Sequence, residues 1–258
     1  MGVHMADANG VRIEIDPLNP AQFFACCGIL ELLSERSPDV LAKFAYQENQ
    51  FRKVNFVLSG VDEVALTGML TALRNSKAIS TTGFKGGEAP VALEIPGTCN
   101  LTLDWWLVPE RNIKSKFKLW AGQQTTLKLV QDMLGADWGN LGNDVLAFRL
   151  PMSGRFGLDP RSAWNALDFG SSPNTQNRDA FTYPAAEMLA AIGLQGFRPK
   201  SNGRRSFSYR LWEQTLPLAP ARAAMAGALT CDSREYAFAV EKRSGSYWCF
   251  TFAQPINQ

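Results

Sequence analysis

The order of apolar and polar positions along the chain predicts a mixture of strands and helices. Val11 to Ile15 alternates apolar with charged residues, which is typical of a half-buried strand. Asn19 then supplies a helix N-cap and Pro20 the first helical turn, and apolar residues recur at helical spacing over residues 20–35. We therefore expect the chain to begin with a strand and a largely buried helix.

The same reasoning along the rest of the chain predicts further elements. Strands are expected at 54–58, 101–107, 236–241 and 247–252, and helices at 61–74, from about 119 to 135, at 184–194 and within 216–227. Residues 197–212 are typical of a hairpin with a basic tip from Lys200 to Arg205, and a second hairpin turns around residues 243–246. Residues 151–183 show little regular pattern and are rich in Gly, Pro, Ser and Asn.

Strands and helices mix without a steady βαβ rhythm, and the late strands come as hairpins. The expected fold class is therefore α+β, with mixed, mainly antiparallel sheets and packed helices. We expect an N-terminal α+β half over residues 6–150 and a basic C-terminal α+β half with hairpins over residues 151–258. One continuous domain would give a similar sequence.

Composition removes several classes of enzyme. Residues 1–5, Met-Gly-Val-His-Met, resemble a cloning scar rather than a secretion or lipidation signal, and they contain His4, the single histidine of the chain. If Met5 is the native start, serine or cysteine triads that use imidazole and His-containing zinc sites are excluded. Carboxylate chemistry, lysine bases and Mg²⁺ sites survive this argument. We expect a protein that is not an enzyme and uses no cofactor and no metal.

The cysteines and the hydropathy indicate a cytoplasmic protein. The five cysteines include no C-x-x-C pair, and Cys26 and Cys27 lie in an apolar helical pattern, where small buried thiols are the simplest interpretation. No apolar run approaches the roughly 20 residues that span a bilayer. We expect a reducing compartment and no membrane contact.

Charge is distributed unevenly and points to a polyanion as partner. Residues 1–110 carry 8 Lys and Arg against 13 Asp and Glu, and residues 111–258 carry 18 against 11. The candidate nucleic-acid-binding residues are Lys114, Lys116, Lys118, Arg149, Arg155, Arg161, Arg178, Arg198, Lys200, Arg204 and Arg205. Candidates for reading base edges are Gln123, Gln124, Asn174 and Asn177.

Two spacings support these candidates. Lys114, Lys116 and Lys118 alternate, so an extended segment would present them on one face toward a phosphate backbone. The arginines of residues 149–178 are interleaved with Phe156, Trp164 and Phe169, a combination suited to phosphate forks and base stacking. The alternatives are a solvated basic face and a loop whose aromatic residues only anchor it to the core.

Several segments resemble a small CRISPR-associated family. Residues 19–32 read N-P-A-Q-F-F-A-C-C-G-I-L-E-L, close to the N-P-G-Q-F-F-A-C-C-G-L-L-E-L start of a family of type I-U systems, also called I-G. Further segments agree in order: L-D-W-W at 103–106, W-A-G-Q-Q at 120–124, F-G-L-D-P at 156–160, Y-P-A-A-E at 183–187 and G-L-Q-G-F-R-P at 193–199. Ala21 replaces the family's glycine, a change that a helix tolerates.

The resemblance implies a subunit of a Cascade-type surveillance complex, in the position of a reduced large subunit. Its implied partners are the other Cascade subunits, guide RNA and target DNA within the complex, and the helicase-nuclease that cuts. Its implied role is to help recognise the motif beside the target and to help recruit that nuclease. In such systems base pairing reads most of the sequence, so a protein subunit needs phosphate contacts and a short-motif reader rather than a catalytic centre.

Two other functions remain as alternatives. The chain can be a purely structural subunit, whose aromatic residues fill protein interfaces and whose arginines meet acidic partners. It can also be a metal-dependent nuclease that uses carboxylates such as Asp159 and Asp168, although no spaced acidic cluster resembles a two-metal site.

Overall fold

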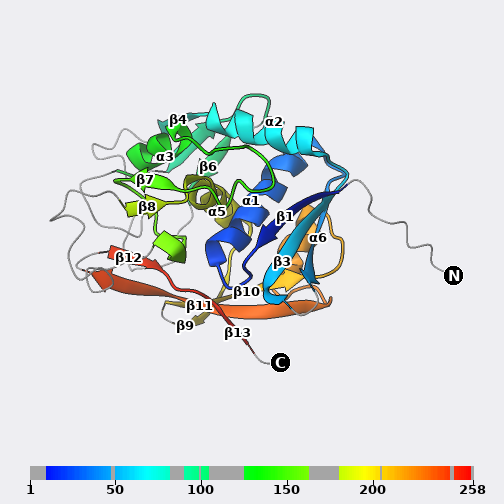
Figure 1. The fold of residues 1–258 in the computed structure, drawn as a ribbon. Coiled ribbons are helices and arrows are strands. Elements are labelled where there is room, and N and C mark those ends of the chain that lie inside the picture. Colours follow the sequence, from blue (N-terminus) through cyan, green and yellow to red (C-terminus); the bar gives the residue numbers. More distant parts are fainter. Residues whose placement is uncertain are drawn as a thin grey trace.

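The fold was analysed in a computed structural model, which describes residues 10–47, 50–81, 90–98, 100–104, 125–162, 180–203, 205–244 and 247–256. These residues contain five helices and four antiparallel sheets, which confirms the α+β class expected from the sequence. A central helix, α1 (Pro20–Arg36), runs through the middle of the molecule with sheets and helices around it (Figure 1). No helix in this part of the chain is long and apolar enough to cross a membrane.

The N-terminal sheet has the strand order β1-β3-β2, with all pairs antiparallel. Its strands are β1 (Val11–Ile15), β2 (Leu41–Gln47) and β3 (Gln50–Ser59). The alternation seen in β1 is confirmed, because Val11, Ile13 and Ile15 are buried and the two residues between them are exposed. Residues 54–58 form part of the longer β3. The sequence did not predict β2, because apolar residues occupy both faces of this strand and blur the period of two.

The C-terminal sheet has the order β12-β11-β10-β9, and β13 also pairs with β11. Its strands are β9 (Lys200–Gly203), β10 (Ser206–Trp212), β11 (Ser233–Ser244), β12 (Tyr247–Phe250) and β13 (Gln254–Pro255). Both predicted hairpins are confirmed, with one correction to the first. Residues 200–203 belong to a strand, so the turn is shorter than the predicted basic tip and connects Gly203 to Ser206.

Two smaller sheets and most of the remaining helices cover the other side of α1, whereas one helix, α6 (Leu218–Met225), packs against β10 of the C-terminal sheet (Figure 1). The strands are β4 (Lys77–Ser80), β5 (Val91–Glu94), β6 (Leu101–Leu103), β7 (Leu150–Met152) and β8 (Ala180–Thr182). The helices are α2 (Glu63–Arg74), α3 (Thr126–Gly135), α5 (Pro184–Gly196), α6 (Leu218–Met225) and the short 3₁₀ helix η1 (Pro160–Ser162). The helix expected from about 119 to 135 begins later, at Thr126, because the described Thr125 is extended and caps it by accepting from the amide of Lys128. The strand expected at 101–107 ends at Leu103, since the described Asp104 is no longer in a strand, and residues 105–124 lie outside the described residues.

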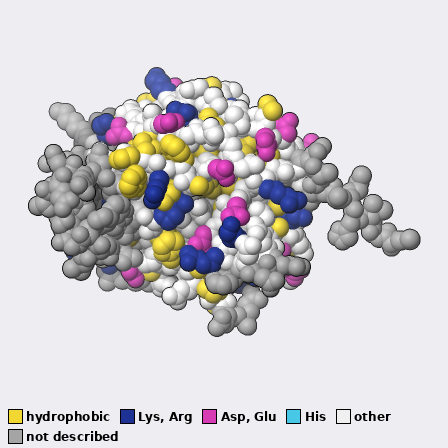
Figure 2. Space-filling model, viewed as in Figure 1, with side chains coloured by type: hydrophobic (Ala, Val, Ile, Leu, Met, Phe, Trp, Pro, Cys, Tyr) yellow, Lys and Arg dark blue, Asp and Glu magenta, His cyan; other side chains and the backbone are white. Residues whose placement is uncertain are grey.

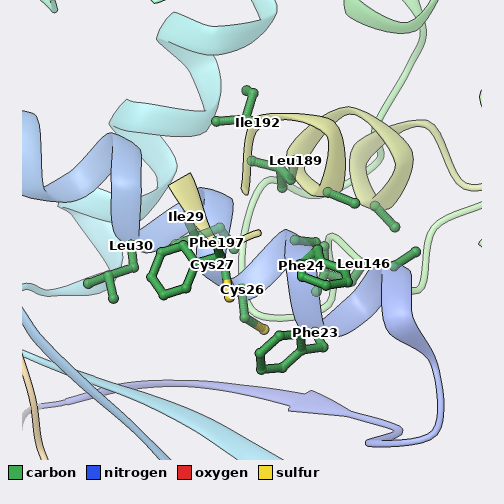
Figure 3. Packing of buried hydrophobic residues seen from close by; sticks show 14 of the residues in the cluster. Phe23, Phe24, Cys26, Cys27, Ile29, Leu30, Leu146, Leu189, Ile192 and Phe197 are labelled. Carbon is green, nitrogen blue, oxygen red and sulfur yellow. The ribbon is translucent and has the colours of Figure 1, made fainter. Parts of the chain in front are cut away.

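Helices α1 and α5 pack backbone against backbone at two glycines. A Cβ atom on Gly28 would lie 2.1 Å from the carbonyl oxygen of Leu189, and a Cβ on Gly193 would lie 2.0 Å from that of Phe24. Neither position can hold a larger residue without moving the helices apart. Figure 3 shows the apolar side chains that fill the surrounding core. The first and last segments of the family resemblance, residues 19–32 and 183–199, therefore meet in this helix pair.

Aromatic residues join α1 to both large sheets. The ring of Phe23 stacks on that of Tyr209 in β10 at a centroid distance of 4.4 Å and lies 5.4 Å from Phe44 in β2. Trp212 donates from Nε1 to the carbonyl oxygen of Ala42 at 2.9 Å. One cluster of buried residues consequently runs from the N-terminal to the C-terminal sheet.

Cys26 and Cys27 lie inside this core and are completely buried. Burial raises the pKa of both thiols well above the ordinary value, which keeps them protonated at neutral pH. The interpretation of these two cysteines as small buried side chains agrees with this packing.

Candidate nucleic-acid interface

A buried carboxylate on α5 holds the segment of residues 156–159. Glu187 accepts hydrogen bonds at Oε2 from the amides of Phe156 and Leu158, at 3.0 and 3.3 Å, and at Oε1 from the amide of Asp159 at 2.9 Å. Its side chain has no exposed surface. Burial, with the neighbouring charge of Asp159, raises the pKa of Glu187 to about 7. The carboxyl group thus fixes three backbone amides of this one segment against the helix.

Asp159 ties the same segment to the start of α1. Its Oδ1 accepts from Nδ2 of Asn19 at 3.1 Å, while Oδ1 of Asn19 caps the helix by accepting from the amides of Ala21 and Gln22. Asp159 and Glu187 belong to F-G-L-D-P and Y-P-A-A-E, so three segments of the family resemblance meet in this buried group. We call Asn19, Asp159, Arg161 and Glu187 the carboxylate junction.

Arg161 completes the junction and points into the molecule. Its Nε and Nη2 donate to Asp159, at 3.0 and 2.6 Å, and Nη2 also donates to the carbonyl oxygen of Leu146 at 2.9 Å. Its Cζ lies 3.5 Å from the ring centroid of Tyr183. Only 22% of the side chain is exposed. Arg161 was predicted to contact nucleic acid, and here its guanidinium is committed to internal partners.

A second group of charged and aromatic side chains lies at one end of the C-terminal sheet. Cζ of Arg205, in the turn immediately before β10, lies 3.8 Å from the ring centroid of Trp248 in β12. Lys242 in β11 is exposed and pairs in register with Trp248. Residues two apart on a strand share a face, so Lys242 and Trp248 continue the face on which Val240 and Phe250 are buried. We call Arg205, Lys242 and Trp248 the sheet-end cluster.

The backbone positions Arg205 in an uncommon conformation. Its φ is 66°, the left-handed region that favours glycine, and its carbonyl oxygen accepts from the amide of Val240 at 2.9 Å. This bond and the stack on Trp248 hold the residue against the neighbouring strands. The guanidinium is therefore pre-oriented by the indole ring.

The carboxylate junction and the sheet-end cluster are connected through Gly157. The amide of Phe250 in β12 donates to the carbonyl oxygen of Gly157 at 2.9 Å. Gly157 has a φ of 83°, and a Cβ there would lie 2.8 Å from the carbonyl oxygen of Trp248, so only glycine fits this approach. Arg155 comes two residues earlier, is partly buried, and its charge acts to lower the pKa of Glu187. Glu187 thus holds the segment that borders the cluster.

The other described candidates lie apart from the sheet-end cluster. Arg149 is exposed, with its Cζ 4.8 Å from the ring centroid of Phe181. Arg198 is exposed and donates from Nε to the carbonyl oxygen of Gln195 at 3.4 Å. Lys200 is exposed on β9, where it pairs in register with Ser208. Among the candidates that the structure describes, Arg205 lies at this end of the sheet, and Arg155 lies two residues before Gly157, which contacts β12.

The remaining candidates fall outside the described residues. These are Lys114, Lys116, Lys118, Arg178, Arg204, Gln123, Gln124, Asn174 and Asn177. Lys242 and Trp248 were not among the sequence candidates. Their hairpin was recognisable from alternation around residues 243–246, but the register that places them opposite each other is visible only in the paired strands.

Positive and negative side chains are interspersed on the face drawn in Figure 2, so this face shows no single basic patch. Among the described residues, no three His, Cys, Asp or Glu side chains are grouped so as to hold a metal ion. Comparisons with models of protein families, with curated proteins and with solved structures found no match to this chain.

Proposed function

We propose that this chain is a non-catalytic subunit of a type I CRISPR interference complex of the Cascade type, in which it contacts target DNA or guide RNA. The observation that carries the proposal is the sheet-end cluster, where Arg205 lies over the indole ring of Trp248 and the exposed Lys242 pairs in register with Trp248. The family resemblance supplies the biological context, and its segments form the helix pair and the carboxylate junction that build this end of the fold.

The chemistry of the cluster suits a phosphate backbone. A guanidinium packed over an indole face keeps its N–H donors for other partners, and its fork of N–H groups matches the geometry of phosphate oxygens. Lys242 adds a second, exposed cationic residue at the position paired in register with Trp248. Such contacts position a subunit on nucleic acid without reading sequence, while base pairing with the guide supplies specificity.

The proposed partners follow from the resemblance. They are the other Cascade subunits, guide RNA and target DNA, and the helicase-nuclease that is recruited after target recognition. The chain's proposed contribution is to stabilise the bound target and help recognise the adjacent motif.

Specific contacts argue against one of the two alternative functions, the nuclease, and leave the other, a purely structural subunit, open. A nuclease that uses Asp159 is disfavoured, because both of its carboxylate oxygens already accept hydrogen bonds from Asn19 or Arg161. Asp168 lies outside the described residues. A purely structural subunit is the remaining alternative, since exposed apolar side chains such as Phe181 and Phe252 can fill protein interfaces.

The test is charge reversal in the guide-loaded complex, reconstituted with the full chain. We compare the unchanged chain with Arg205→Glu/Lys242→Glu and with a control of equal charge change, Arg12→Glu/Lys77→Glu. Arg12 and Lys77 are exposed, and their strands lie away from β12 in Figure 1. The measurements are co-purification of the subunits and affinity for a matched DNA target at two salt concentrations.

The proposal expects normal assembly, a loss of affinity of about tenfold at low salt, and a salt slope smaller by about two for the first variant alone. Equal losses in both variants would show that only net charge matters. Loss of assembly in the first variant with unchanged DNA affinity per assembled complex would favour the structural alternative. Failure of the unchanged chain to join the complex would sink the subunit proposal.

A further inference from the structure

The ribbon formed by β7 and β8 presents an exposed aromatic ring beside an exposed arginine. Phe181 is 42% exposed and pairs in register with Pro151, which is also exposed. Cζ of Arg149 lies 4.8 Å from the ring centroid of Phe181. The ring, the proline and the guanidinium thus form one small platform at the surface.

The residue that follows β8, Tyr183, belongs to a second arginine–aromatic pair, which is part of the carboxylate junction. Tyr183, two residues after Phe181, carries the guanidinium of Arg161, and that guanidinium is neutralised by Asp159. Arg149 is exposed instead, and it forms no ion pair with a carboxylate among the described residues. Figure 2 shows apolar side chains gathered over the region of α3, β7 and β8, with a Lys or Arg side chain beside them. Apolar surface and positive charge therefore coincide at this ribbon.

We propose that the β7–β8 ribbon binds an unpaired base of single-stranded nucleic acid. The base stacks on the layer formed by Phe181 and Arg149, and Arg149 donates an N–H to an adjacent phosphate oxygen. A single strand is the required ligand, because the faces of bases inside a duplex are covered by their neighbours. This site lies outside the sheet-end cluster, and binding there does not depend on membership of an interference complex.

The test uses the full chain alone and fluorescein-labelled (dT)20, with fluorescence anisotropy at low salt. An abasic strand of the same length and charge separates stacking from phosphate contact. The variants are Phe181→Ala, Phe181→Tyr and Arg149→Lys. The matched control is Phe252→Ala, because Phe252 has the same side chain at a similar exposure of 44% and lies near the C-terminal β13.

Phe181→Ala is expected to weaken binding of (dT)20 by about tenfold and to leave binding of the abasic strand unchanged. Phe181→Tyr keeps the ring and the affinity, Arg149→Lys weakens both strands, and Phe252→Ala changes neither. Equal effects of the two alanine variants overturn the proposal, as does an unchanged chain without measurable affinity for (dT)20. If Phe181→Ala lowers co-purification with the other subunits and leaves oligonucleotide affinity intact, the ribbon is a protein interface. None of these outcomes bears on the sheet-end cluster, which is tested by other residues.

Discussion

The carboxylate junction and the sheet-end cluster each place an arginine over an aromatic ring, but the charges around the two arginines differ. Arg161 lies over Tyr183 at 3.5 Å, and Arg205 lies over Trp248 at 3.8 Å. Arg161 also bonds to the buried carboxylate of Asp159, which cancels its charge inside the fold. The neighbour of the Arg205 stack is Lys242, a second cation. An arginine over an aromatic ring is thus committed to the fold where a buried carboxylate pairs with it, as in Arg161, whereas Arg205 forms no ion pair with the residues that the structure describes.

The largest expected effect is a difference in the free energy of unfolding between variants of Arg161 and variants of Arg205. Arg161→Ala leaves the buried Asp159 carboxylate without its ionic partner and should lower the free energy of unfolding by about 3–5 kcal/mol. Arg205→Ala removes a partly exposed stack and should lower it by less than about 1 kcal/mol. Urea unfolding followed by circular dichroism measures both values. Similar losses for the two variants would remove the distinction between an internal and an available arginine.

The next largest effect concerns Glu187, whose carboxyl group holds residues 156–159 between the carboxylate junction and the sheet-end cluster. Glu187→Gln places an amide NH₂ where a carboxylate oxygen accepts backbone N–H groups, so one or more buried donors lose a partner. The free energy of unfolding should fall by about 1–3 kcal/mol. Glu241→Gln on the exposed part of β11 is the matched control and should change it by less than about 0.5 kcal/mol.

The pH dependence of the same pair of variants tests the electrostatics of the junction. The folded-state pKa of Glu187, about 7, lies above the ordinary value of 4.5, so the folded protein holds this proton more tightly than the unfolded chain. The proton on Glu187 therefore contributes its full stabilisation below the ordinary pKa of 4.5, and this contribution is lost as the pH rises through the folded-state pKa of about 7. The stability difference between the unchanged chain and Glu187→Gln should therefore shrink between about pH 5 and about pH 8. A difference that grows with pH would mean that the carboxylate, not the acid, is the favoured form.

The smallest expected effect concerns the backbone that supports the outer stack. Arg205 has a φ of 66°, which costs any residue with a Cβ atom and costs glycine nothing. Arg205→Gly should therefore be more stable than Arg205→Ala by about 0.5–1 kcal/mol, although both lose the stack and the charge. Urea unfolding of the two variants, measured in parallel, gives this difference in the free energy of unfolding. Should Arg205→Ala prove the more stable, the left-handed turn is not a feature that the hairpin requires.

Part of the candidate site followed from the sequence, and part did not. Local patterns predicted the Asn19 cap, the α1 and α5 helices and the two C-terminal hairpins, because each depends on residues close together in the chain. Arg161 was identified as a candidate by the aromatic residues interleaved with it, and Arg205 by its place in the basic hairpin tip, but their ring partners, Tyr183 and Trp248, come from other segments. Composition alone could not distinguish Arg161 from Arg205, since the partners that decide their roles are distant in sequence or set by strand register.

The sequence by itself determined the α+β class, the buried character of α1 and the position of its N-terminus, because periodicity, capping and helix-starting residues act locally. Only the tertiary structure decided which charges are internal and which are exposed. Asp159 meets Asn19 across 140 residues, and Trp248 meets Lys242 and Arg205 through strand pairing. The free-energy cost of a charged side chain depends on its burial and on its partners, and both are set by residues that are distant in the sequence.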